Sequence, residues 1–407
     1  MIPKSAKIVV IGGGVFGTSA AFRLADAGHR DVVLLDRGPI ASGTTPFAAG
    51  QTGYLNSDRF SLEFGCYNIE FFENFEQHTG QPIDFHQCGS LRVALTERYQ
   101  TNLESQVETA TELGHDVQLI SHDRATELVP TFSPPAGCRV LWIPRDGYVE
   151  PKSVAVAYAA AARERGVEIC TRVAVSGIQT EGGRVRAVST SAGTIETEWV
   201  VLAAGAWTRQ FCHGLGLNLP AVPVRHQAFV TAPLAGVLAE QPIVRITEPQ
   251  IYVRHEARGL MVGGYGYRPI SFDMDEFPDD FEIAALESDL VYFERLRAAA
   301  TEFFPGLEKA VIVQERRGLP TISPDGRLIV SEPGGFNGLV IVSACGVGGI
   351  SASPGVGRLV AEIVSGETPW IDPDLVSAGR FGGKFSEDAK LRARCEEVYA
   401  HHYHDNY

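Results

Sequence analysis

Two apolar runs near the N-terminus predict buried strands on either side of a helix. Residues 8–11 (IVVI) and 32–35 (VVLL) are continuous apolar runs, which are typical of parallel strands covered on both faces. The apolar positions between them follow helical spacing, so the segment predicts strand, helix and strand in that order. The next stretch, residues 42–54 (SGTTPFAAGQTGY), fits neither period and is expected to be a functional loop.

Glycines at the end of the first strand indicate a dinucleotide site. Gly12, Gly14 and Gly17 have the G-x-G-x-x-G spacing, and the second strand ends at Asp36. In this motif the first glycine permits a tight turn, the second admits a pyrophosphate, and the third lets helix and strand pack closely. The acidic side chain is then placed for a ribose hydroxyl. The complete set of features favours dinucleotide binding over a plain glycine turn.

Two later apolar runs also end in small residues. Residues 199–202 (WVVL) lead into Ala204, Gly205 and Trp207, and residues 339–343 (LVIVS) lead into the sequence ACGVGGI. Backbone N–H groups at such ends can face an anion or the edge of a flavin. At each site alone, a strand-to-helix turn without a ligand is the alternative. Three such ends on one sheet favour one shared ligand, and the loop after the second strand favours FAD, which is long enough to reach it.

Composition limits the class of protein. The chain has 407 residues, of which 44% are hydrophobic and 21% charged, so it can bury a large core in two domains. The net charge of -14 disfavours nucleic acid and anionic membrane surfaces as partners. No apolar stretch approaches the roughly 20 residues that span a bilayer. The seven cysteines are odd in number and lack zinc-site spacing, which indicates reduced thiols and no bound metal. The N-terminal apolar run is too short for a signal peptide, so a cytoplasmic location is expected.

Eight segments together resemble one family. The sequence is similar to the FAD-dependent amine and amino-acid oxidoreductases of the D-amino-acid oxidase superfamily. Within it, the resemblance is strongest to the flavin unit of dimethylglycine and sarcosine dehydrogenases and to glycine and sarcosine oxidases. The matching segments, in the family's order, are SGTTPFAAG (42–50), GSLRVALTER (89–98), IPRDGYVEP (143–151), VVLAAGAWT (200–208), RHQAFVT (225–231), YVRHEARGLMVGGYG (252–266), SPDGRL (323–328) and ACGVGGISASPGVGRLVAEIVSG (344–366).

The resemblance implies an α/β fold with a Rossmann-like FAD-binding domain that is discontinuous in sequence. A second, α+β substrate domain is expected on a mostly antiparallel sheet, to which the alternating segments HQAFVTA and IYVRHE are suited. The acidic residues 271–282 are expected in a solvated surface loop, and the C-terminal tail as a surface helix with a frayed, solvated end whose histidines bind no metal. The expected division is 1–86, 147–220 and 318–375 for the FAD domain, 87–146 and 221–317 for the substrate domain, and 376–407 for the C-terminal helix and tail.

Residues that would bind FAD follow from the same resemblance. The related dehydrogenases attach flavin through a histidine whose position here is Phe47, and monomeric sarcosine oxidases through a cysteine whose position here is Gly318. Noncovalent FAD is therefore expected. The implied cofactor-binding residues are Gly12, Gly14, Val15, Phe16, Gly17, Asp36, Arg37, Ser42, Thr44, Thr45, Phe47, Ala48, Ala49, Gly50, Val173, Ala204, Gly205, Trp207, Gly346, Gly348, Gly349 and Ile350.

The substrate side is defined by fewer residues. An amine donates a hydride only when it is neutral, and a histidine with an ordinary pKa of about 6.5 suits removal of its proton. His226 and Tyr252 match the residues that related enzymes place at the substrate. The superfamily arginine that binds a carboxylate is replaced by Pro320, and the oxygen-activating lysine of sarcosine oxidases by Met261. Further candidates for substrate contacts are Gln51, Tyr54, Tyr265, Arg316, Arg317 and Ser351, the last of which replaces a carboxylate-binding lysine.

These features predict an FAD-dependent oxidase of a secondary amine or an N-substituted, glycine-type amino acid. The product imine would be hydrolysed to an amine and an aldehyde or oxo acid, and O2 reduced to H2O2. A dehydrogenase with a protein or quinone acceptor, a D-amino-acid oxidase and an inactive flavin-binding protein remain alternatives, and an aromatic hydroxylase is disfavoured because ACGVGGI replaces its G-D motif. A folate-binding half is not expected, and the protein is expected to be a monomer or small homo-oligomer.

Overall fold

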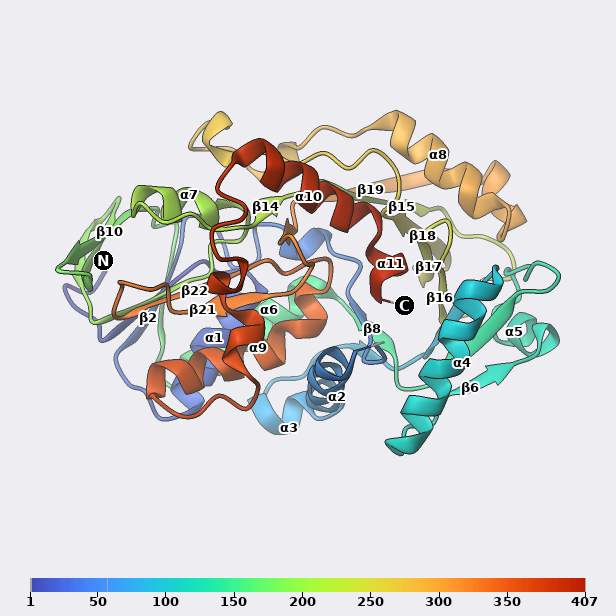
Figure 1. Cartoon of the computed structure of the whole chain (residues 1–407), viewed down its shortest axis with the longest axis horizontal. Coiled ribbons are helices and arrows are strands. Elements are labelled where there is room, and N and C mark those ends of the chain that lie inside the picture. Colours follow the sequence, from blue (N-terminus) through green and yellow to red (C-terminus); the bar gives the residue numbers. More distant parts are fainter. Residues whose placement is uncertain (1, 57, 407) are drawn as a thin grey trace.

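The computed structural model describes residues 2–56 and 58–406 and contains two large sheets side by side. Figure 1 shows the smaller parallel sheet with its helices on the left and the larger sheet with α8 on the right. The N-terminus lies at one end, beside β10, and the C-terminus lies near the centre. This arrangement places the C-terminal segment where the two halves of the protein meet.

The six-stranded sheet has the order β21-β22-β13-β1-β2-β9. All neighbouring strands are parallel except the edge pair β21 and β22. The carboxyl ends of β22, β13 and β1 therefore meet at one edge, as the three glycine-rich strand ends predict. The strands are β1 (Ile8–Ile11), β2 (Val32–Asp36), β9 (Glu168–Thr171), β13 (Trp199–Leu202), β21 (Ile329–Ser331) and β22 (Leu339–Ser343).

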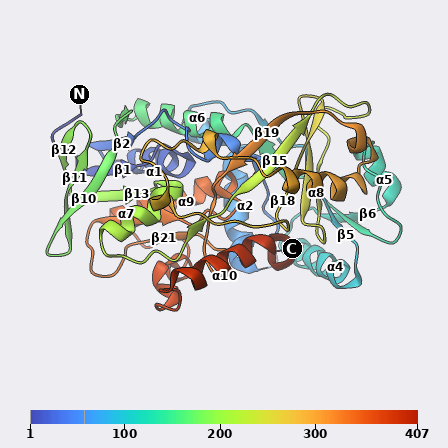
Figure 2. The same cartoon turned by 90° about the horizontal axis from the view of Figure 1, so that it is seen from above.

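Alternate residues of this sheet enter two different cores. Ile8 and Val10 pack towards the helices α1 (Val15–Asp26), α6 (Pro151–Glu164) and α9 (Gly349–Ser365). Val9 and Ile11 pack on the other face, against a three-stranded sheet. Since both faces are covered, a continuous apolar run suits each strand. The covering sheet, at one end of Figure 2, consists of β10 (Val175–Glu181), β11 (Arg184–Thr190) and β12 (Gly193–Glu196).

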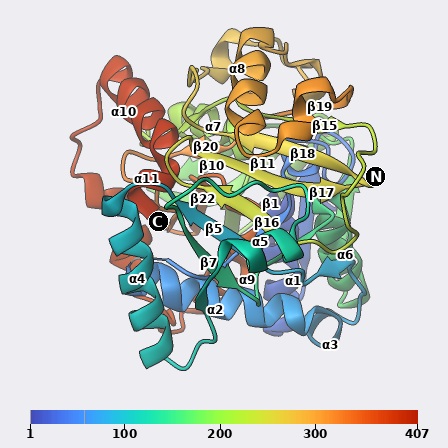
Figure 3. The same ribbon diagram turned by 90° about the vertical axis from the view of Figure 1, so that its right-hand side faces the viewer.

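The second sheet has eight strands in the order β19-β15-β18-β17-β16-β5-β7-β6. Its neighbours are antiparallel except for β5 and β16. Figure 3 shows from the side that helix α8 (Leu290–Thr301) covers one face. Phe293 and Leu296 of this helix belong to the core beneath it. The strands are β5 (Ser90–Ala94), β6 (Gln118–Ile120), β7 (Arg139–Ile143), β15 (His226–Thr231), β16 (Ile243–Ile246), β17 (Ile251–Glu256), β18 (Gly259–Gly264) and β19 (Ile312–Gly318).

Small sheets and further helices join these two parts. The small sheets are β3-β8-β4, with β3 (Gln51–Thr52), β4 (Phe85–His86) and β8 (Gly147–Val149), and β14-β20, with β14 (Val222–Pro223) and β20 (Thr321–Ile322). The other α-helices are α2 (Arg59–Glu73), α3 (Phe75–Thr79), α4 (Glu97–Glu112), α5 (His122–Leu128), α7 (Thr208–Gly214), α10 (Asp388–Ala400) and α11 (His402–Asn406). Short 3-10 turns are η1 (Thr45–Phe47), η2 (Gly205–Trp207), η3 (Met274–Glu276), η4 (Ile283–Ala285), η5 (Pro305–Lys309), η6 (Pro373–Val376) and η7 (Ala378–Phe381).

The predicted α/β fold class is confirmed, and each sheet takes its strands from the segments expected for its domain. The exact domain bounds stay a prediction. Among the described residues, no helix combines the length and apolar character needed to cross a membrane.

The prediction for the C-terminal tail is correct for the surface helix, which is α10, and wrong for the frayed, solvated end, where α11 follows. Leu391, Cys395, Tyr399 and Tyr403 are each at most 2% exposed, and they pack with apolar residues of β14, β15, β17 and β18. Burial of one such large side chain contributes about 1.5–3 kcal/mol, so the helices are held against the second sheet. Figures 1 and 2 show α10 running along the molecule to α11 at its centre. The sequence pattern concealed this because charged residues occupy the exposed positions between the buried ones.

The prediction of a solvated surface loop for residues 271–282 is correct for most of its acidic side chains, which are exposed, and wrong for its apolar side chains, which pack against the protein. Met274 is 4% exposed and Ile283 is 1% exposed. These residues form a cluster with Ala206, Leu286 and Leu319, against which Phe272, Phe277 and Phe281 also pack. The carboxylates alternate with apolar side chains, so the segment is acidic on its outside and apolar towards the protein.

Candidate active site

One cavity of about 1570 Å³ lies between the two sheets. It is lined by the carboxyl ends of β1, β13 and β22 on one side and by His226, Arg245 and Tyr252 of the second sheet on the other. Pockets for drug-sized ligands typically measure about 300–1,000 Å³. The cavity is therefore large enough for a dinucleotide together with a small substrate.

The three glycines of the turn have different surroundings. Gly12 has a φ of 111°, and a Cβ there would lie 2.3 Å from the Ala203 carbonyl oxygen. A Cβ on Gly17 would lie 1.8 Å from the Gly12 carbonyl oxygen. A Cβ on Gly14 would meet only the Thr45 Oγ1, at 3.4 Å. Gly12 and Gly17 are thus required by packing, whereas Gly14 leaves space that opens into the cavity.

Two helices begin at the cavity wall without a side-chain cap. Helix α1 follows Gly14, and the N–H of Val15 donates to the Thr45 Oγ1 at 3.1 Å. Helix α9 follows Gly348. The positive ends of both helix dipoles, with backbone N–H groups of the first turns, suit an anion such as a pyrophosphate or an electron-rich flavin carbonyl.

Asp36 ties the second strand to the glycine turn. Its Oδ2 accepts the N–H of Gly13 and its Oδ1 accepts the N–H of Gly38, both at 2.6 Å. Burial raises the pKa of this carboxyl, although these two hydrogen bonds and the neighbouring Arg37 oppose the rise. Asp36 lines the cavity with Val173, where the ribose and adenine of a dinucleotide would lie.

Arg37 closes this part of the cavity. Its guanidinium lies 3.9 Å above the Trp207 ring and donates to the backbone oxygens of Asp279, at 3.0 Å, and Phe281, at 2.6 Å. The acidic segment therefore covers the cavity from the side of the second domain. Contacts of this kind, between segments far apart in the chain, cannot be predicted from local sequence patterns.

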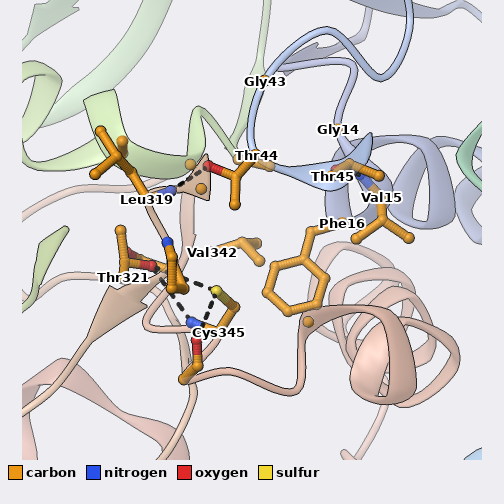
Figure 4. A pocket seen from close by; sticks show the side chains of 18 of the residues that line it. Gly14, Val15, Phe16, Gly43, Thr44, Thr45, Leu319, Thr321, Val342 and Cys345 are labelled. Carbon is orange, nitrogen blue, oxygen red and sulfur yellow. Dashed lines mark hydrogen bonds between the residues drawn. The ribbon is translucent and has the colours of Figure 1, made fainter. Parts of the chain in front are cut away.

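Figure 4 shows the apolar middle of the cavity, where the ring of Phe16 lies across from Cys345 and beside Val342. The Thr44 Oγ1 accepts the N–H of Leu319 at 3.1 Å, and the Thr321 Oγ1 accepts the N–H of Cys345 at 3.4 Å. These bonds fix the two loops that face each other. Apolar side chains such as Phe16, Val342 and Leu319 line the space between them, which suits an isoalloxazine ring.

All residues predicted to bind FAD line the cavity except Gly17, which lies beneath the turn and acts through packing. Phe47 and Gly318 also line it, so neither position offers a side chain for covalent attachment. The open Gly14, the two uncapped helices and the length of the cavity fit FAD. The individual contacts with the cofactor stay predictions.

His226 lies between two tyrosines at the substrate end. Its Nδ1 is 2.9 Å from the Tyr399 hydroxyl, and its Nε2 is 2.9 Å from the Tyr252 hydroxyl. Burial lowers the pKa of His226 to about 4. The expectation of an ordinary histidine pKa is therefore wrong, because burial away from water disfavours the imidazolium. His226 is neutral at pH 7.

An aromatic cluster surrounds the same end. The Tyr265 ring stacks on His226, with centroids 5.2 Å apart, and meets His402 and Tyr403 edge to face at 4.8 and 5.0 Å. The pKa of His402 is lowered to about 3 by burial and by the nearby His226 and Arg245. The cavity wall here consists of uncharged aromatic rings, and the face of such a ring can bind an alkylammonium group.

Arg245 is a buried charged group at the cavity wall that was not predicted from the sequence. It lines the cavity at 4% exposure, and its Nη1 lies 2.6 Å from the Asp146 Oδ2. Its Nη1 also donates to Ser90 Oγ at 3.0 Å, and its Nε donates to Gln51 Oε1 at 2.9 Å. A single arginine within an apolar strand (IVRI, residues 243–246) was the available indication.

Three predicted substrate residues do not line the cavity. The Arg316 guanidinium pairs with Glu256 at 3.3 Å, and Arg317 donates to Ser288 Oγ at 2.9 Å. Tyr54 packs against His115, with ring centroids 5.2 Å apart. These predictions are corrected, since side-chain direction depends on the tertiary fold. Gln51, Tyr265 and Ser351 do line the cavity, whereas His402 and Tyr403 were missed because the tail was expected in solvent.

Comparison with known proteins assigns the family. Residues 7–363 match the DAO family of FAD dependent oxidoreductases, and the chain belongs to this family. It is 31% identical over 408 residues to 4-methylaminobutanoate oxidase (formaldehyde-forming) of Paenarthrobacter nicotinovorans, covering 99% of this chain and 49% of that protein. It is 32% identical over 405 residues to mitochondrial dimethylglycine dehydrogenase of Rattus norvegicus, covering 97% and 47%. The chain thus spans about half the length of these curated relatives.

A solved structure agrees with this assignment. The L-proline dehydrogenase from P. horikoshii superposes with a TM-score of 0.84 at 25% identity, covering 94% of this chain and 99% of that one. The predicted fold, the FAD dependence and the assignment to the oxidoreductases are therefore confirmed.

Proposed function

We propose that the protein oxidises the C–N bond of a secondary amine or an N-substituted, glycine-type amino acid. The observation that carries this proposal is the neutral His226, which is hydrogen-bonded to Tyr252 at the end of the same cavity that the glycine turn enters. An amine nitrogen must lose its proton before the adjacent carbon releases a hydride. A neutral imidazole next to a hydroxyl can take that proton.

Different residues of the cavity have different roles in the proposed reaction. When bound, FAD supplies the acceptor for the hydride that leaves the carbon next to nitrogen. Tyr252 contacts the amine and passes its proton towards His226, while the rings of Tyr265 and Tyr403 exclude water and face the alkyl groups. The resulting imine is hydrolysed by water to an amine and an aldehyde or oxo acid.

We assign the substrate carboxylate to Arg245, in place of Arg316 and Arg317. Its ion pair with Asp146 and its bond to Gln51 hold the guanidinium in a fixed orientation at the cavity wall. A fixed guanidinium can bind a carboxylate with directional hydrogen bonds. The name of the relative that acts on 4-methylaminobutanoate supports a substrate with both an amine and a carboxylate.

Oxygen is the proposed electron acceptor, with H2O2 as the product. Met261, which takes the place of an oxygen-activating lysine, is fully buried away from the cavity. A dehydrogenase with a protein or quinone acceptor is therefore the alternative. A cytoplasmic location and a monomer or small homo-oligomer stay predictions.

Product analysis tests this proposal. Purified holoenzyme is mixed in air with sarcosine, dimethylglycine or 4-methylaminobutanoate, and H2O2 and aldehyde are measured together. Equal amounts of both are expected from the accepted substrate. Aldehyde that forms only with an added dye acceptor would identify a dehydrogenase, and oxidation of D-amino acids alone would replace the substrate class.

A further inference from the structure

Tyr399 reaches the active site from outside the region that defines the family. The family match ends at residue 363, whereas Tyr399 lies on α10 and is 2% exposed. Its hydroxyl is 2.9 Å from the Nδ1 of His226, on the side of the ring opposite Tyr252. Tyr399 does not itself line the cavity, so it can act on a substrate only through His226.

The hydrogen-bond pattern distinguishes the two nitrogens of the neutral imidazole. A neutral histidine has one N–H donor and one acceptor nitrogen. The Tyr399 hydroxyl donates to the carbonyl oxygen of Gly264 at 3.5 Å, so its oxygen can accept the Nδ1–H of His226. The Nε2 is then the acceptor and receives the hydroxyl hydrogen of Tyr252. In this arrangement a lone pair of the Tyr252 oxygen is available to an N–H in the cavity.

We propose that Tyr399 is a positioning residue that fixes His226 with its proton on Nδ1 and its acceptor Nε2 towards Tyr252. The role rests on the proposed oxidation of an amine. An ammonium N–H gives its proton to the Tyr252 oxygen while the Tyr252 hydroxyl proton moves to Nε2. The amine becomes neutral, Tyr252 keeps one proton, and His226 becomes an imidazolium whose two N–H groups donate to the two tyrosines. With the opposite tautomer, Nε2 would carry a hydrogen and could accept none.

Packing keeps Tyr399 in place. Its ring meets the Tyr265 ring edge to face, with centroids 5.7 Å apart. Leu391 and Cys395, on the same helix, are fully buried against the second sheet. The titratable groups in ring contact with or bonded to His226 are Tyr252, Tyr265 and Tyr399, and His402 lies near it as well. None of these side chains is a carboxylate, so hydrogen bonds rather than an ion pair orient the imidazole.

A matched pair of tyrosine variants tests the role. Tyr399→Phe removes the hydroxyl and keeps the ring, whereas Tyr292→Phe removes a buried hydroxyl that bonds the oxygens of Gly264 and Gln227 and does not contact His226. Anaerobic flavin reduction by saturating amine is expected to slow roughly tenfold or more in Tyr399→Phe, because the Nδ1–H loses its acceptor and roughly nine-tenths or more of the histidine then carries its proton on Nε2, with little change in substrate Kd. Tyr292→Phe is expected to stay within about twofold of the wild type.

The same substitution in a His226→Asn background separates positioning from packing. There, Tyr399→Phe is expected to cause no further loss, since both changes act through one group. An equal loss in both backgrounds, or an equal loss in Tyr292→Phe, would overturn the proposal.

Histidine 15N NMR of the holoenzyme gives a readout without turnover, with the His226 signals identified from their absence in His226→Asn. The expected spectrum has a protonated Nδ1 and an unprotonated Nε2 in the wild type, and a largely protonated Nε2 in Tyr399→Phe. A protonated Nε2 in the wild type, or an unchanged tautomer in the variant, would overturn the proposal. The expected spectra combined with no reduction by any amine would overturn the proposed function instead and leave Tyr399 as the residue that orients His226.

Discussion

Gly17 packs so closely against Gly12 that a Cβ on Gly17 would lie 1.8 Å from the Gly12 carbonyl oxygen. The contact joins the first turn of α1 to the end of β1, and it sets the direction of the helix N-terminus at the cavity. Gly14, between them in the sequence, has no such neighbour, because its Cβ would meet only the Thr45 Oγ1 at 3.4 Å. The three glycines of one motif therefore serve different ends, two for packing and one for the ligand.

Gly14→Val is expected to yield folded protein without flavin. The added methyl groups would occupy the space in front of the helix N-terminus, whereas the Cβ itself fits. The thermal unfolding of apoprotein and the ratio of flavin to protein absorbance measure the two effects. Gly17→Val should instead lose stability in the apoprotein as well, and Gly306→Ala, where a Cβ meets nothing within 4 Å, should affect neither. A fully yellow Gly14→Val protein would contradict the cofactor site.

Acid precipitation of the wild-type holoenzyme is expected to release all flavin into the supernatant. Phe47 and Gly318, at the two positions where relatives attach flavin, have no nucleophilic side chain. Absorbance of the supernatant and of the redissolved pellet measures the free and bound fractions. Flavin that stays with the pellet would contradict noncovalent binding, and peptide mapping would then examine Cys345, whose thiol also lines the cavity.

Much of the cofactor half could be predicted because its determinants are local. The glycine spacing, the apolar runs and Asp36 each express a requirement of one strand or one turn, and the structure brings their strand ends together. The resemblance to the family then identified the remaining segments of this half from their order along the chain.

The substrate half could be predicted less well because it depends on long-range packing. Tyr399 and His402 lie near residues of β15 and β17 that are more than 140 positions away. The helical spacing of Leu391, Cys395, Tyr399 and Tyr403 indicates a buried face, but it does not indicate which surface that face packs against. Arg316 and Arg245 are both arginines on strands of one sheet, but only the tertiary fold decides that Arg245 lines the cavity.

Stability is expected to fall as the pH decreases from about 7 towards 4. The folded-state pKa values of His226, about 4, and His402, about 3, lie below the unfolded value of 6.5, so the unfolded chain binds more protons in this range. The free energy of unfolding therefore increases as the pH rises from the folded-state pKa values towards 6.5. It decreases as the pH falls through the same range. Urea unfolding at pH 7 and pH 5 measures the difference, which should be smaller in His402→Gln. An equal fall in wild type and variant would contradict the buried, neutral His402.

His226→Asn is expected to lower the rate of anaerobic flavin reduction by roughly 10²-fold, the usual contribution of a positioned acid or base. In the wild type, this rate should show no ionisation of His226 near pH 6.5, because burial lowers its pKa to about 4. His29→Asn is a control, since that side chain lies on the surface and bonds Ser365. An unchanged rate in His226→Asn would return His226 to a structural role.

Anaerobic reduction of the bound flavin by a panel of amines tests the central claim most directly. Sarcosine, dimethylglycine and 4-methylaminobutanoate are compared with betaine, which has the carboxylate and the methyl groups but a nitrogen with neither a proton nor a lone pair. Loss of the flavin's visible absorbance with one or more of the N-substituted amino acids, and none with betaine, is the predicted result. An absorbance that none of these amines changes, in holoenzyme that dithionite still reduces, would contradict amine oxidation at this site.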